Sequence, residues 1–274
     1  MTHRLAKLQS IWQSAPYAFA FIGAVVIFAI TLIANQGSGA SQIVSAALAF
    51  GSFYALVGIG QMFVITSGPG NIDLSVPSNI ALSGAVAMSI MGGSDAMIPL
   101  GLLAALGCGA AIGGVNYALI SILRIPPIIA TLSSSFVVQS LAIVHGRGLR
   151  ITPPPLLAEI ATGRVAGILI FSALVIALAG VMALVLHRSV YGRFLKAIGQ
   201  NMNAAGLAGI RVGLVRCGTY VLCAVFAALC GVLLAAFSGG ASLNMGEEYL
   251  LASIAVVVIG GTSVAGGFSN VSGI

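Results

Sequence analysis

"TSGPGNIDLSVPS", residues 66–78, interrupts a chain that is otherwise strongly apolar. Gly68, Pro69 and Gly70 disfavour a continuous helix, and Asp73 follows at the start of the next apolar run. Aspartate stabilises a helix N-terminus, where backbone N–H groups are free, so one interpretation is a simple helix cap. The other is a broken membrane helix beside a pathway, because irregular backbone at membrane depth needs a covering of protein or water. The two interpretations are compatible.

The composition indicates that the chain on both sides of this break lies in a membrane. The chain has 274 residues, of which 59% are hydrophobic and 6% charged, whereas soluble domains carry about 25% charged residues. We therefore predict an all-α, polytopic transmembrane helical bundle. The net charge of +6 does not indicate nucleic-acid binding, because the basic residues fall in loops between apolar runs. The four cysteines lack metal-ligand spacing and are predicted to be packing residues.

A membrane span needs about 20 mostly apolar residues, and this criterion predicts about eight spans. Basic residues concentrate on one side when the N-terminus is cytoplasmic, as the positive-inside rule requires. The third span is predicted to be short or broken, and the eighth is weak. The chain ends in the glycine-rich "VIGGTSVAGGFSNVSGI", from which we expect one or two C-terminal spans to be missing. The predicted spans are 17–34, 43–65, 74–92, 97–121, 127–144, 165–187, 213–237 and 249–264.

Two features are assigned to the opposite, external side. The proline run Pro153–Pro155 cannot lie inside a helix, so its loop is predicted to be extended. Glu247 and Glu248 are interpreted as charges on the outer face that meet a binding protein.

Residues 188–212 form the largest predicted cytoplasmic loop. Within it, "NMNAAGLAGI" has the pattern of a short helix, with Asn201 as N-cap and Gly209 as the C-terminal stop. Ala204, Ala205 and Leu207 give this helix a small apolar surface. The helix either docks into a groove of a partner protein or lies on anionic lipid at the bilayer surface.

The sequence contains no signature of enzyme chemistry. It has no GxxxxGK[ST] phosphate-binding loop and no HExxH pattern. We predict that the chain is not an enzyme and that it binds no metal or cofactor.

Four segments in order carry a family resemblance. "NIDLSVPSNIALSGAVAM", "PPIIATLSSSFVVQSLA", "YGRFLKAIGQNMNAAGLAGI" and "VVVIGGTSVAGG" resemble the motifs of permease subunits of ribose-type (carbohydrate uptake) ABC importers. The chain departs from those motifs at Pro77, Gly206 and Ala208.

The resemblance implies that residues 1–274 form a single transmembrane permease domain in a bacterial inner membrane and that residues 188–212 form its coupling loop. It implies an alternating-access importer for a sugar or similar small polar solute. The implied partners are two ATP-binding subunits that use the ATP, a second identical or related permease, a periplasmic or lipid-anchored solute-binding protein, and membrane lipid. The docking interpretation of Asn201, Ala204, Ala205, Leu207 and Gly209 follows from the same resemblance.

Uncharged polar residues inside the spans are candidates for the translocation path, because a neutral sugar needs fixed hydrogen-bonding groups. An interhelical hydrogen bond is the commoner role of such residues and is the favoured interpretation of each one. The scarcity of intramembrane ionisable residues argues against a proton-coupled carrier. An ATP-independent channel or facilitator remains as an alternative, and so does a non-transporting membrane scaffold. With Asp73, the candidates are Gln61, Asn79, Ser83, Asn116, Thr131, Ser133 and Gln139.

Overall fold

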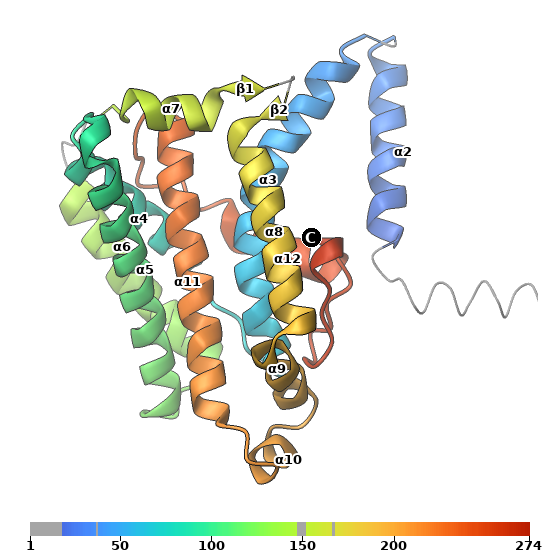
Figure 1. Ribbon diagram of the computed structural model, residues 1–274, viewed down its shortest axis with the longest axis vertical. Helices are drawn as coiled ribbons and strands as arrows, with labels where there is room; N and C mark the ends of the chain where they lie inside the picture. The colour runs from blue at the N-terminus through green and yellow to red at the C-terminus, as the bar shows by residue number, and fades with distance from the viewer. Residues whose placement is uncertain (1–17, 37, 147–151, 166–167) are drawn as a thin grey trace, which may run out of the picture.

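The computed structural model describes residues 18–36, 38–146, 152–165 and 168–274, and these form a helical bundle (Figure 1). Helix α2 (Ala18–Ala34) stands beside the bundle (Figure 1). The helices that cross or enter the bundle are α3 (Ala40–Thr66), α4 (Val76–Met91), α5 (Ile98–Ser121), α6 (Pro127–Gly146), α8 (Ile170–Arg188), α11 (Val212–Phe237) and α12 (Tyr249–Ile259). The remaining elements are η1 (Asp95–Met97), α7 (Pro155–Thr162), the hairpin β1 (Arg164–Val165) and β2 (Ile168–Leu169), α9 (Val190–Gln200), α10 (Met202–Leu207) and η2 (Val271–Gly273).

The lengths of the helices confirm an all-α, polytopic membrane protein. Within the described part of the chain, five helices are long and apolar enough to span a bilayer: α3, α5 together with η1, α6, α8 and α11. Three shorter apolar helices, α2, α4 and α12, occupy the other predicted spans. The third span is thus short, as predicted, and the weak eighth span is short as well. The predicted start of the first span at residue 17 lies outside the described residues.

Two predicted span boundaries are wrong. The sixth span was predicted from residue 165, but the β1–β2 hairpin occupies residues 164–169 and α8 begins at Ile170. The eighth span was predicted to reach residue 264, but α12 ends at Ile259. Gly260 follows, and Gly261 has a φ of 86°, a left-handed conformation that ends helices.

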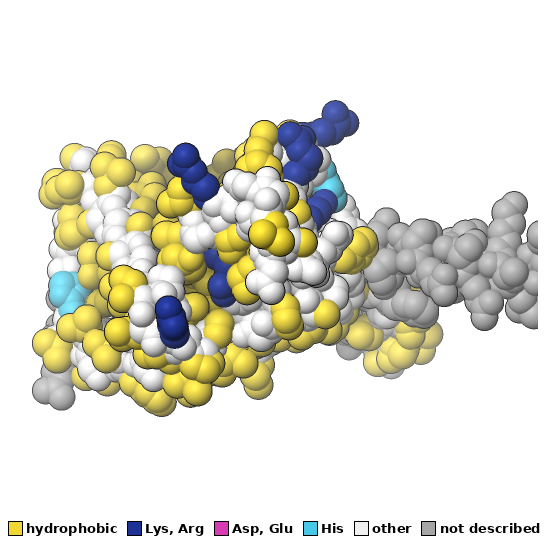
Figure 2. All heavy atoms as spheres, turned by 90° about the horizontal axis from the view of Figure 1, so that it is seen from below, with side chains coloured by type: hydrophobic (Ala, Val, Ile, Leu, Met, Phe, Trp, Pro, Cys, Tyr) yellow, Lys and Arg dark blue, Asp and Glu magenta, His cyan; other side chains and the backbone are white. Residues whose placement is uncertain are grey.

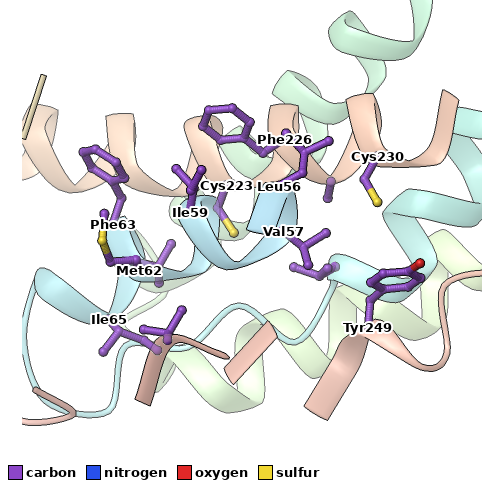
Figure 3. Packing of buried hydrophobic residues seen from close by; sticks show 14 of the residues in the cluster. Leu56, Val57, Ile59, Met62, Phe63, Ile65, Cys223, Phe226, Cys230 and Tyr249 are labelled. Atoms are coloured by element: carbon purple, nitrogen blue, oxygen red, sulfur yellow. The ribbon is translucent and has the colours of Figure 1, made fainter. Parts of the chain in front are cut away.

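Helix α11 lies against α3, α4 and α5, and small residues allow these close approaches (Figure 1). A Cβ atom on Gly113 of α5 would lie 2.5 Å from the Tyr220 carbonyl oxygen, and one on Gly109 would lie 2.6 Å from the Ala224 carbonyl oxygen. Membrane helices gain stability from such contacts, since lipid is as apolar as their side chains. Figure 3 shows the apolar packing between α3 and α11, with Leu56 and Phe226 among the buried residues.

The proline run is not extended along its whole length. Pro155 is the first residue of α7, where the fixed φ of proline suits a helix and its missing N–H costs nothing. Helix α7 lies across one end of the bundle (Figure 1) and buries Leu157 and Ala161. The prediction failed because proline is excluded from the interior of a helix but not from its first turn.

Candidate functional site

Helix α4 begins inside the bundle rather than at its end. In its first turn, the Asn79 Nδ2 donates a hydrogen bond of 2.9 Å to the Ala224 carbonyl oxygen, and Ala224 lies at the middle of the 26-residue α11. Residues 67–75 connect the end of α3 to this interior start without forming a helix. The segment that opens at Gly68 is therefore a re-entrant loop followed by a half-helix, which confirms the predicted break.

The Asp73 carboxylate organises the start of this half-helix. Its Oδ1 accepts hydrogen bonds from the Ser75 backbone nitrogen at 2.9 Å and from the Ser75 hydroxyl at 2.6 Å. The Asn116 Nδ2 of α5 lies 3.3 Å from the same oxygen and 2.7 Å from the Ser75 Oγ. Ser75, not Asp73, occupies the N-cap position, and Asp73 lies two residues before that N-cap. Asp73 is almost fully buried and thus serves as an acceptor within the fold.

Two further candidates complete this polar network. The Ser134 hydroxyl of α6 donates to the Asn116 Oδ1. The Thr131 Oγ1, also on α6, accepts a hydrogen bond of 3.0 Å from the Leu74 backbone nitrogen. Polar bonds from α5 and α6 therefore fix the loop on both sides of Asp73. Sequence reasoning missed Ser75 and Ser134, although both lie beside residues that it selected.

The remaining candidates are dispersed through the bundle. Asn79 also accepts a hydrogen bond of 2.8 Å from the Ser83 hydroxyl. The Gln139 Nε2 of α6 donates to the Leu243 carbonyl oxygen at 3.2 Å. Gln61 is fully buried in α3, with its Oε1 3.5 Å from the Cys223 sulfur. Ser133 lines an apolar groove of about 590 Å³ between α5 and α6. Most of the predicted path residues thus act in contacts between helices.

A second half-helix, α12, starts at the same level as α4. The Tyr249 ring, in its first turn, lies 5.3 Å from the ring of Tyr54, which is near the middle of the 27-residue α3. Figure 3 shows Tyr249 beside the α3 residue Val57 and the α11 residue Cys230. A Cβ atom on Gly246 would collide with the Pro77 carbonyl oxygen at the start of α4. The two half-helices therefore meet halfway through the bundle.

Glu247 and Glu248 lie at this midpoint and are exposed on the surface of the single chain. The prediction that they mark the outer face is wrong, because residues 238–248 return into the bundle after α11 ends at Phe237. Carboxylates at such a depth face water or protein rather than lipid, because their transfer into hydrocarbon is costly. The signal in the sequence was the eleven-residue apolar run preceded by glycine, since short interrupted segments mark half-helices.

One end of the bundle carries the predicted 188–212 loop and most of the basic residues that the structure describes; Arg164 in β1 lies at the other end. Figure 2 shows lysine and arginine side chains on this face, and among the described residues no acidic side chain is visible there. Helix α9 attaches the loop to the bundle through the buried Leu195 and Ile198. Partial burial lowers the pKa of the Lys196 ammonium on the same helix.

Helix α10 projects from this end beyond α9 (Figure 1). The Asn201 Oδ1 accepts a hydrogen bond of 3.0 Å from the Ala204 backbone nitrogen, and Gly209 has a φ of 83°. The predicted cap and stop are therefore confirmed. Leu207 is 92% exposed, whereas Ala205 is buried against the bundle. Ala205 consequently anchors the short helix, and its exposed apolar surface includes Met202, Ala204, Leu207 and the following Ala208.

Comparisons with known proteins agree with this architecture. Residues 43–272 match the family model described as branched-chain amino acid transport system / permease component. No solved structure matches the chain significantly.

Several curated permeases are similar to most of the chain. The ribose import permease protein RbsC of Escherichia coli (strain K12) is 34% identical over 232 residues, which cover 81% of this chain and 70% of the relative. RbsC of Bacillus subtilis (strain 168) is 33% identical over 222 residues, or 80% and 68% of the two chains. The galactofuranose transporter permease protein YtfT of Escherichia coli (strain K12) is 36% identical over 225 residues, or 79% and 63%.

Proposed function

This chain belongs to the family of branched-chain amino acid transport system permease components, and from that premise we propose that it is the membrane permease of an ATP-driven importer for a sugar. Two permease chains, identical or related, enclose the translocation path between them. Two separate ATP-binding subunits hydrolyse the ATP. A periplasmic or lipid-anchored binding protein delivers the solute, and the complex alternates between outward-facing and inward-facing states.

The observation that carries this proposal is the form of the 188–212 loop. Helix α9 holds it against the bundle through buried apolar residues, while α10 presents a leucine that is 92% exposed. A short helix with an apolar surface fits a groove in a partner protein. An ATP-independent facilitator needs no such contact, so the loop favours a subunit that is driven from outside the membrane.

The positive-inside rule gives the orientation within the inner membrane. The basic face with α9 and α10 is cytoplasmic, and α7 faces the periplasm, with the N-terminus in the cytoplasm. The ATP-binding subunits then reach α10 from the cytoplasm, and the binding protein approaches α7 from outside.

The midpoint of the bundle favours a neutral, polyhydroxylated solute. Carboxylates accept hydrogen bonds from hydroxyl groups, so Glu247 and Glu248 are suited to contact a sugar between two permease chains. The names of the curated relatives, ribose and galactofuranose permeases, point to the same class.

Uptake by intact cells tests the proposal. A strain lacking the gene and a complemented strain are compared for uptake of radiolabelled ribose, galactose, leucine and valine. We expect sugar uptake to depend on the gene and to stop when cellular ATP is depleted. Uptake of leucine or valine alone would refute the substrate class, and uptake that survives ATP depletion would favour the facilitator.

A further inference from the structure

Arg216, in the first turns of α11, lies between the 188–212 loop and the re-entrant loop. Its Nη2 donates a hydrogen bond of 2.7 Å to the Asn71 Oδ1, and its Nη1 is 3.7 Å from the Met202 sulfur at the start of α10. Asn71 also accepts a hydrogen bond of 3.1 Å from the Tyr220 hydroxyl and donates one of 3.1 Å to the Gly68 carbonyl oxygen. One guanidinium group therefore contacts two loops that are far apart in the sequence.

A cavity of about 410 Å³ surrounds this contact. The re-entrant loop, the first residue of α6, the end of α9 and the start of α10 form its walls, and Arg216 lines it. The hydrogen bond between Arg216 and Asn71 therefore lies in a cavity and not in a tightly packed interface. Such a space gives the loops room to move relative to each other while the hydrogen bond keeps them linked.

The end of α9 also contacts the end of α3 directly. A Cβ atom on Gly199 would collide with the Thr66 carbonyl oxygen and the Gly267 backbone nitrogen. Gly267 in turn donates a backbone hydrogen bond of 3.0 Å to the Thr66 carbonyl oxygen. The end of α9 is therefore packed directly on the end of α3, and the re-entrant loop receives its separate contact through Arg216.

The charge of Arg216 is not used in an ion pair. Among the described residues no carboxylate lies within ion-pair distance of it, and its buried Nε has no hydrogen-bond partner. The Asn71 amide is neutral, so its hydrogen bond with Arg216 does not neutralise the guanidinium charge. The bond must therefore serve another purpose. The rigid fork of guanidinium donors does, however, hold a partner in a defined direction.

We propose that Arg216 is a positioning residue that transmits displacement of the cytoplasmic loop to the half-helix α4. In this mechanism, movement of α10 shifts the guanidinium group, and the bond to Asn71 draws the re-entrant loop with it. Asp73 lies two residues beyond Asn71 and fixes the start of α4, so the displacement reaches the middle of the membrane. The inference rests on the proposed function, because it requires that ATP-binding subunits move α10.

The test measures how many ATP molecules are hydrolysed for each solute molecule transported. The permease is reconstituted in proteoliposomes with its ATP-binding subunits and binding protein, and radiolabelled ribose is the probe. Arg216→Met removes the donors and keeps an extended side chain, whereas Arg216→Lys keeps the charge without the fork. Arg124→Met is the matched control, because Arg124 is exposed in the connection between α5 and α6 and lies outside the coupling loop.

We expect Arg216→Met to bind the ATP-binding subunits and hydrolyse ATP normally, while ribose transported per ATP falls at least tenfold. Arg216→Lys should be intermediate, and Arg124→Met should match the unmodified protein. Asn71→Ala should reproduce the defect, and combining it with Arg216→Met should add little, because both remove the same bond. If Arg216→Met fails to reach the membrane, Asn71→Ala decides the question by the same ratio.

A normal transport-to-ATP ratio in Arg216→Met, or in Asn71→Ala when it decides, would overturn the proposal. Loss of the ATP-binding subunits from Arg216→Met would also overturn it, because the residue would then act in docking. Failure of the proposed function looks different. In that case the unmodified protein itself shows no ATP-dependent ribose uptake, whatever the state of Arg216.

Discussion

Leu207 offers the most direct test of the cytoplasmic loop, because its side chain is 92% exposed in the single chain. If it occupies a groove in an ATP-binding subunit, its burial contributes about 1.5–3 kcal/mol. Removal of that contribution corresponds to a loss of affinity of about 10- to 150-fold. Leu207→Ala should therefore weaken ATPase binding by an amount within this range. Leu207→Asp should abolish binding, because it places an unpaired charge in an apolar groove.

The same exposure predicts an unchanged permease. A side chain with so little contact to its own chain contributes little to folding, so the membrane level and thermal stability of both variants should equal those of the unmodified protein. Binding is measured by titration of the purified permease with the ATP-binding subunits, and function is measured by ATP-dependent ribose uptake. Leu214→Ala is the matched control, because Leu214 is 65% exposed at the start of α11 but lies outside α10.

Two results would refute this reasoning. If Leu207→Asp binds the ATP-binding subunits with unchanged affinity and supports full uptake, α10 is not the docking element. If Leu214→Ala weakens binding as strongly as Leu207→Ala, the ATP-binding subunits recognise the whole cytoplasmic end of the bundle and α10 is not the specific docking element.

Three further predictions concern the half-helices and the orientation. Asp73→Asn should retain an acceptor for Ser75 and remain folded. Asp73→Leu leaves the donors around it unpaired, at a cost of about 1–3 kcal/mol each, and should lower the unfolding temperature in detergent. Equal stability of Asp73→Asn and Asp73→Leu would contradict the assigned hydrogen-bond network. In a variant without the native cysteines, a cysteine at Gln200 should react with an impermeant reagent only from the cytoplasm, and one at Leu156 only from outside; the reverse pattern would invert the topology. The double variant Glu247→Gln and Glu248→Gln should assemble normally but transport ribose at least tenfold more slowly. Normal transport would place the pair outside the path.

The sequence predicted elements whose signals are local. Hydropathy located the long spans, and the glycines and proline before Asp73 located the break in the third one. Asn201 and Gly209 identified the ends of α10 correctly, because caps depend on a few neighbouring residues. The start of α7 was missed since the exclusion of proline from helix interiors was extended to the first turn, where proline is favourable.

The depth of a residue in the membrane was the information that local patterns did not supply. Glu247 and Glu248 follow a long span and precede a weak one, so their sequence position alone suggested a surface loop. Their actual level depends on contacts with distant elements, such as the Tyr249 ring against Tyr54. The same limit applies to Arg216, whose bond to Asn71 joins residues 145 positions apart.

The two half-helices are fastened in different ways, and the difference bears on how a movement could reach them. Directional hydrogen bonds from Asn116 and Ser75 to Asp73 hold the start of α4, whereas α12 packs on α3 through apolar side chains such as Tyr249. Directional bonds weaken steeply when their geometry changes, while apolar contacts are non-directional and tolerate a small slide. A displacement delivered through Asn71 would therefore act first on the polar network of α4. The midpoint would open by movement of α4 away from Glu247 and Glu248, with α12 remaining on α3.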